Sequence, residues 1–138
     1  MMNRRFSPLR RALGVLAALT LSGVAFAHHS FAMFDFSKVT TLRGTVKEFH
    51  WANPHVILWV NADVAGQQQL WYAELTSPGN LTRVGWNKRA FQPNDKVEVE
   101  IAPLRDGKQG GAFKKGTLLD TGKVWTSDLR QQEKPGLE

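Results

Sequence analysis

Histidine is the residue type in this sequence with the clearest capacity for chemistry. The chain has four histidines and no cysteine, so any metal site would depend on nitrogen and oxygen ligands. The histidines form two pairs, His28 with His29 and His50 with His55, and the second pair flanks the turn at Asn53-Pro54. If that loop holds four residues, His50 and His55 are cross-strand neighbours with Cβ atoms about 5 Å apart. Two imidazoles at this separation could share one metal ion.

The other pair, His28 and His29, directly follows a segment with the three parts of a secretory signal peptide. Four arginines precede residue 12, an apolar run occupies residues 12–21, and small residues end at Ala27. The apolar run is too short to span a bilayer, which takes about 20 residues. We therefore expect residues 1–27 to be a cleaved signal peptide, and the mature protein to be periplasmic, exported by the Sec pathway and without a stable membrane anchor.

Cleavage after Ala27 would make His28 the first residue of the mature chain. Its α-amine and imidazole could chelate one ion, completed by His29 or a histidine of the folded domain, an arrangement that suits Cu(II). Cleavage one residue earlier would place His29 third, which creates a square-planar site for Cu(II) or Ni(II). The sequence thus predicts a site for copper or another divalent transition metal at His28, His29, His55 and His50, with weaker binding below about pH 6. The alternative is that these are ordinary rim histidines and a disordered end.

Aromatic residues give a second, independent hypothesis. Exposed tryptophans beside a concave face stack on sugars or bases. This predicts an oligosaccharide or small-ligand module, whose binding residues would be Trp51, Asn53, Trp59, Trp71 and Trp86. Large aromatic residues also dominate the cores of small domains, so packing is the competing interpretation.

Complete catalytic constellations are absent from the sequence, and we expect a protein that is not an enzyme. Glu48 and Glu74 fall on strand surfaces, where solvated ion pairs are more usual than a glycosidase pair in a cleft. The glycines at 107–111 lack the lysine-serine ending of a phosphate loop. An oxidative enzyme built on the N-terminal histidines is a third hypothesis, and the lone Tyr72 is its only candidate axial ligand.

Charge does not favour nucleic acid as a partner. The chain carries a net charge of +6, with 18 basic and 12 acidic residues. Four of the basic residues lie in the expected signal peptide and no acidic residue does, so the mature chain carries +2. The basic character of the precursor therefore reflects export rather than a nucleic-acid surface.

The elements that must position these side chains are mainly strands. Alternating or apolar runs predict strands at 40–51, 56–61, 69–75, 96–101, 115–119 and 123–126, with a short helix at 77–85, a flexible loop at 105–111 and a disordered tail at 131–138. Gly44 and a change of apolar parity after Val46 suggest a bulge or bend in the first strand. We expect an all-β fold with one short helix, a small five- to six-stranded OB-like barrel over residues 28–130, with a β-sandwich as the alternative.

Several short motifs resemble one known family. These are His28-His29-Ser30-Phe31, Phe34-Asp35, Gly44-Thr45-Val46, Trp51 to His55, Trp71 with Glu74, Ser77-Pro78, Leu81 and Gly85-Trp86. Together they resemble the DUF6152 proteins, small exported bacterial proteins of unknown function, over nearly all the mature chain up to about Val99. The resemblance implies an exported β-rich domain and supplies no activity. It implies that His28, His29 and His55 fall on recurring positions of the family's sequence pattern, whereas His50 does not. This favours a site formed by the N-terminus and His55.

Overall fold

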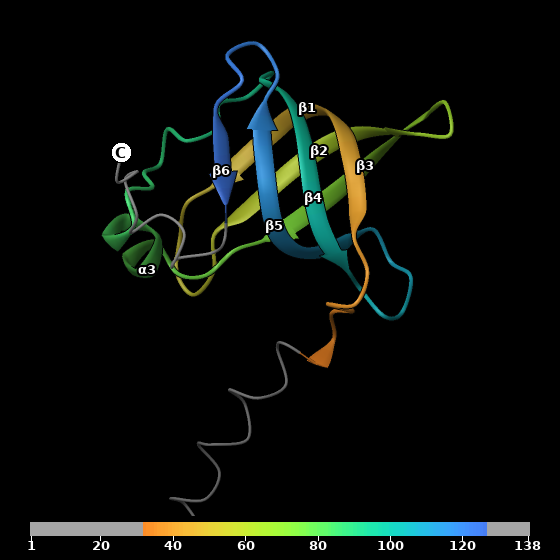
Figure 1. The fold of residues 1–138 in the computed structure, drawn as a ribbon, viewed down its shortest axis with the longest axis horizontal. Helices are drawn as coiled ribbons and strands as arrows, with labels where there is room; N and C mark the ends of the chain where they lie inside the picture. The colour runs from red at the N-terminus through yellow and green to blue at the C-terminus, as the bar shows by residue number, and fades with distance from the viewer. Residues whose placement is uncertain (1–31, 127–138) are drawn as a thin grey trace, which may run out of the picture. The chain divides into compact units, whose positions relative to one another are not determined.

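Six strands and one short helix make up the part of the chain that the structure, a computed structural model, describes, residues 32–126 (Figure 1). Their order is β1 (Thr40–His50), β2 (Ile57–Val64), β3 (Gln67–Glu74), α3 (Pro78–Arg83), β4 (Lys96–Pro103), β5 (Gly110–Leu118) and β6 (Val124–Thr126). The expected signal peptide at 1–27, His28, His29 and the expected tail at 131–138 lie outside the described residues. Between residues 32 and 126, no helix has the length and apolar character needed to cross a membrane.

The strands close into a barrel. Antiparallel pairs join β1 to β2, β2 to β3, β1 to β4 and β4 to β5. A short parallel pair between β3 and β5 then closes the ring, and β6 extends it as an additional strand beside β5. This is the connectivity of the predicted five- to six-stranded OB-like barrel, with the helix between the third and fourth strands. The fold prediction is confirmed, and the barrel replaces the alternative of a β-sandwich.

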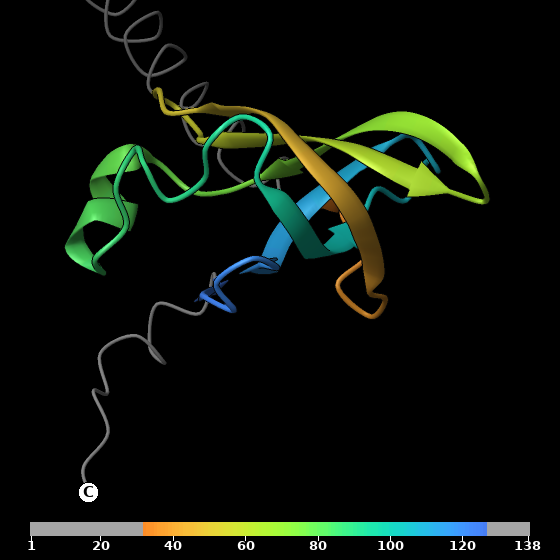
Figure 2. The same ribbon diagram turned by 90° about the horizontal axis from the view of Figure 1, so that it is seen from above.

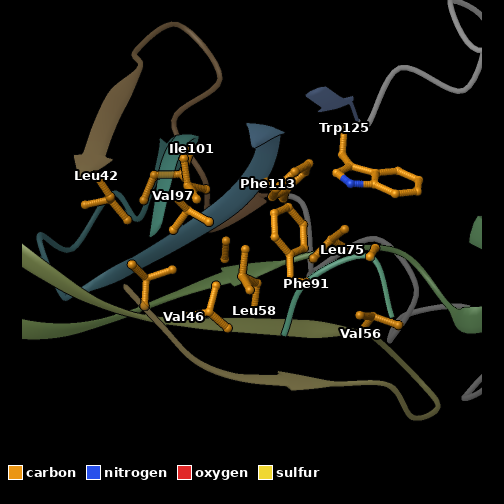
Figure 3. Close-up of a cluster of buried hydrophobic side chains, with 14 of the residues drawn as sticks. Leu42, Val46, Val56, Leu58, Leu75, Phe91, Val97, Ile101, Phe113 and Trp125 are labelled. Carbon is orange, nitrogen blue, oxygen red and sulfur yellow. The ribbon is translucent and has the colours of Figure 1, made fainter. Parts of the chain in front are cut away.

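The interior of the barrel follows from period-two alternation along its strands. Leu58, Val60 and Ala62 of β2 are fully buried, while Ile57, Trp59 and Asn61 between them are only partly covered. The alternating apolar residues of β4 predicted to face inward, Val97, Val99 and Ile101, are likewise fully buried. Figure 3 shows Leu58, Val97 and Ile101 in the same cluster as side chains of β1 (Leu42 and Val46) and β5 (Phe113). Residues of opposite parity are thereby fixed on the outer surface of the barrel.

Strand β1 bends so that it can pair with two neighbours. Gly44 is the register partner of both Ala62 in β2 and Val97 in β4. A Cβ atom at Gly44 would overlap the carbonyl oxygen of Asn61, so only glycine fits this close approach of strands. The bulge comes slightly later, where the register shifts between Val46 and Glu48. The predicted change of parity after Val46 is therefore confirmed.

Helix α3 lies beyond one end of the barrel (Figures 1 and 2). The helix begins at the sequence signal that predicted it: the Ser77 hydroxyl accepts a hydrogen bond from the Asn80 amide, and Pro78 occupies the first turn. Leu81 from this helix and Trp86 just after it are each 1% exposed and belong to the core. The segment thus closes the barrel with apolar side chains.

One expected loop is partly a strand. The flexible loop predicted at 105–111 ends earlier, because Gly110 and Gly111 are the first residues of β5. A Cβ atom at Gly110 would overlap the ring of Tyr72, and one at Gly111 would overlap the backbone of Ala102. Gly110 therefore allows close packing of β5 against β3, and Gly111 allows close packing of β5 against β4.

Candidate functional site

The His55 ring lies against the Glu74 carboxylate at the end of the β2–β3 ladder. The amide of Val56 donates to the carbonyl of Thr76 at 3.1 Å, and the amide of Leu75 donates to the carbonyl of Val56 at 2.8 Å. These bonds continue the pairing of β2 with β3 past Ile57 and place His55 beside the last residue of β3. His55 Nδ1 lies 2.7 Å from Glu74 Oε1, and the two side chains are 42% and 20% exposed.

This pairing has a chemical consequence for His55. A carboxylate beside Nδ1 favours the neutral tautomer that carries its hydrogen on Nδ1, and the free lone pair of the imidazole is then on Nε2. A carboxylate behind the imidazole is the usual arrangement around histidines that bind metal ions, because it orients the ring and raises its basicity. This arrangement would suit the partly exposed ring of His55 to bind a metal ion through Nε2.

His50 does not share a site with His55 in the way its spacing suggested. The loop between the strands runs from residue 51 to residue 56, longer than the four residues assumed, and His50 is opposite Ile57. The prediction that the two imidazoles are cross-strand neighbours is wrong. His50 instead approaches Glu48, with Nδ1 3.2 Å from Oε1, and both of these side chains are more than half exposed.

A complete set of metal ligands is not present in residues 32–126. Within this range, histidine, aspartate and glutamate side chains nowhere gather in a group of three or more that could hold an ion. Of the predicted ligands, His50 and His55 lie apart within the described residues, and His28 and His29 lie outside them.

The beginning of the described domain is fixed on the strand that adjoins Glu74. Phe34 is only 3% exposed, bridges to Leu104, and packs with Ala102 and Ala112. Ala112 is in turn the register partner of Glu74 in the parallel β3–β5 pair. Phe34 thereby anchors the start of the described domain on β4 and β5.

Asp35 secures the same segment by polar contacts. Its amide donates to the carbonyl of Pro103 at 2.8 Å. The Ser37 hydroxyl donates to its carboxylate at 2.6 Å and, with Lys38, holds the pKa of that carboxyl below its usual value. Backbone pairing and a local charge network thus reinforce the anchoring by Phe34.

The tryptophans predicted to bind a ligand have different environments. Trp86 is 1% exposed, with its ring against Phe113 and Trp125 at centroid distances of 5.5 and 4.8 Å. Its assignment as an exposed stacking residue is wrong, because the segment after α3 carries it into the core. Trp51 and Trp71 are half-buried and pack against that core.

The remaining two predicted ligand residues lie at the surface. Trp59 lies on the outer face of the barrel beside Tyr72, with ring centroids 5.6 Å apart. Asn53 is exposed, in a loop with a cis peptide bond before Pro54.

Sequence reasoning placed Glu74 among solvated surface carboxylates and missed its pairing with His55. The signal was available in the hairpin that joins β2 to β3. Its turn pairs Val64 with Gln67, and counting back along both strands brings Ile57 opposite Glu74. His55, two residues before Ile57, then falls within reach of that carboxylate.

Comparison with known proteins gives one match. The family model described as a family of unknown function, DUF6152, matches residues 16–114. This range runs from before the expected cleavage site into β5. No curated protein and no solved structure matches the chain.

Proposed function

Because this chain belongs to the DUF6152 family, a family of unknown function, we propose a function from the site itself: an exported periplasmic module that binds a divalent transition metal without catalysing a reaction. The ligands are His55 and the mature N-terminus with His28 and His29. Copper fits this nitrogen-rich set best, since amine and imidazole ligands in tetragonal geometry favour Cu(II).

The contact between His55 and Glu74 is the observation that carries the proposal. A surface histidine needs no carboxylate on Nδ1 at 2.7 Å, whereas a metal ligand gains orientation and basicity from one. Glu74 is the less exposed of the two partners, at 20%, so the carboxylate supports the ring from the side of the protein. Nε2 then remains as the donor atom for an incoming ion.

The length of chain before Phe34 is compatible with ligands from the N-terminus. His28 precedes Phe34 by six positions, and six extended residues reach about 20 Å at most. The proposal requires this span to bring the N-terminal histidines to His55.

Titration of the mature protein, beginning at His28, with Cu(II) or Zn(II) tests this function. We expect a rise in melting temperature with ion concentration, since an ion that binds only the folded state stabilises it. Glu74→Gln should weaken binding about 10- to 100-fold, the usual effect of removing a carboxylate behind a metal-bound histidine. N-terminal sequencing of the exported protein establishes whether His28 carries the free amine.

Glu48→Gln is the matched control, because it removes the carboxylate that contacts His50 in the same manner. We expect this variant to bind the ion as the unaltered protein does. A melting temperature that neither ion changes would contradict the proposal. Equal losses of ion affinity in Glu48→Gln and Glu74→Gln would contradict it as well.

A further inference from the structure

Two rows of register partners cross the outer face of the barrel beside the candidate site. One row contains Glu48, Trp59, Tyr72 and Gly110, from β1, β2, β3 and β5. The adjacent row contains His50, Ile57, Glu74 and Ala112. Residues in one row are lateral neighbours on one surface, about 4.8 Å apart at the backbone. Two aromatic rings, Trp59 and Tyr72, and two carboxylates, Glu48 and Glu74, therefore lie within a small area of one surface.

Trp59 and Tyr72 form what we call the aromatic platform. A Cβ atom at Gly110 would overlap the Tyr72 ring, so this ring extends over the bare backbone of β5. The Trp59 ring lies at a centroid distance of 5.6 Å and an interplanar angle of 55°. Both side chains are half-buried, with the barrel wall beneath them. Tyr72 also packs against the cluster of Phe34, Ala102, Leu104 and Ala112, so only part of its ring is accessible.

The electrostatic surroundings of the platform are negative. Glu48 is directly opposite Trp59, and Glu74 follows Tyr72 on the same face. Burial and the charges of Glu74 and Asp106 raise the pKa of Tyr72, and Lys108 opposes them only in part. Lys108 is itself paired with Asp106 at 3.0 Å. An anionic ligand is disfavoured here, and a positively charged one is favoured.

We propose that the aromatic platform binds the ammonium group of a small organic cation, of the alkylamine or quaternary ammonium class. The negative faces of tryptophan and tyrosine rings attract such groups, and a carboxylate on each side adds charge complementarity. A neutral ligand of the same shape gains only apolar contact. The platform shares Glu74 with the metal proposal, but it requires neither a metal ion nor His55.

Amide chemical-shift titration of the metal-free mature protein with choline tests the platform. The matched probe is 3,3-dimethylbutan-1-ol, in which carbon replaces the charged nitrogen. We expect choline to shift the Trp59 indole signal and amides of β2 and β3, and to bind about fivefold or more tighter than the neutral alcohol. Working without metal keeps the outcome independent of His55.

Substitutions then locate the site. Trp59→Leu should weaken choline binding about two- to fivefold, the fold-change expected from one cation–π contact at an exposed site. Glu48→Gln alters an exposed side chain without touching the core and should weaken binding about twofold. Its control is Glu98→Gln, which removes an outer-face carboxylate on β4 that pairs with Arg43 instead, and should bind normally.

Three results would overturn the proposal. Equal binding of choline and the neutral alcohol would show that charge plays no part. Unchanged binding in both Trp59→Leu and Glu48→Gln would place the site elsewhere. Shifts of the same amides by maltohexaose but not by choline would identify the platform as a saccharide surface.

Discussion

Replacement of Gly44 by alanine tests whether the barrel closes as described. The new Cβ would lie 2.8 Å from both the Cα of Ala62 and the carbonyl carbon of Asn61, and closer still to the Asn61 oxygen. All three are backbone atoms, so no side chain can rotate away, and β1 must separate from β2. Overpacking costs about 1–3 kcal/mol, and two disrupted ladder hydrogen bonds add about 1 kcal/mol each. We expect a loss of about 3–5 kcal/mol, against a total of about 5–15 kcal/mol for an ordinary domain.

Urea unfolding followed by tryptophan fluorescence measures this loss, because core tryptophans such as Trp86 and Trp125 become exposed on unfolding. Gly79→Ala is the matched control. Its Cβ would meet no atom within 4 Å among the described residues, and it lies within α3, so alanine should stabilise by about 0.5–1 kcal/mol. A Gly44→Ala variant within about 0.5 kcal/mol of the unaltered protein would contradict the close approach of β1 and β2.

Two further predictions concern the surroundings of the candidate site. Phe34→Ala should lower the free energy of unfolding by about 2–4 kcal/mol, since it removes a ring that is 3% exposed. The control Phe36→Ala, at a position 50% exposed, should lower it by less than about 1 kcal/mol. Equal losses of stability in urea unfolding would contradict the anchoring by Phe34. Tyr72 is the only tyrosine, so absorbance at 295 nm reports its ionisation alone. Burial, followed by the Glu74 charge, raises its pKa, so the midpoint should exceed about 10 and fall in Glu74→Gln. Because the raised pKa belongs to the folded state, stability is retained below pH 10 and is lost as pH rises through that midpoint; a midpoint at or below 10 would refute this.

Most of the fold could be predicted because each strand has its own alternation of apolar and polar residues. Val97, Val99 and Ile101 are separated by charged residues, and this spacing alone gives their inward orientation. Ser77 and Pro78 likewise specify where α3 begins. Such signals lie within a few residues of the feature they determine, so a single sequence contains them.

The errors arose where contacts join distant segments. Nothing near Gly110 indicates that the Tyr72 ring will cover it, since the two residues meet only when β3 pairs with β5. Trp86 resembles any surface tryptophan until the segment after α3 turns it into the barrel end.

The candidate site was predictable in part. The histidine pattern identified His55, but its partner Glu74 belongs to another strand and required the hairpin register. The separation of His50 from His55 depended on a loop length that composition does not specify. Residue type thus suggested the chemistry, while long-range pairing decided which side chains could meet.

The parallel β3–β5 pair also has a consequence for the order in which the strands pair during folding. It contains three register pairs, far fewer than the eight that join β2 to β3, and its partners are separated in sequence by α3 and β4. A growing chain can therefore complete the β1–β3 meander while β3 still has one unpaired edge. Exposed strand edges pair with other chains. Until residues 110–112 pair with β3, this edge of an incompletely folded chain is therefore prone to aggregation.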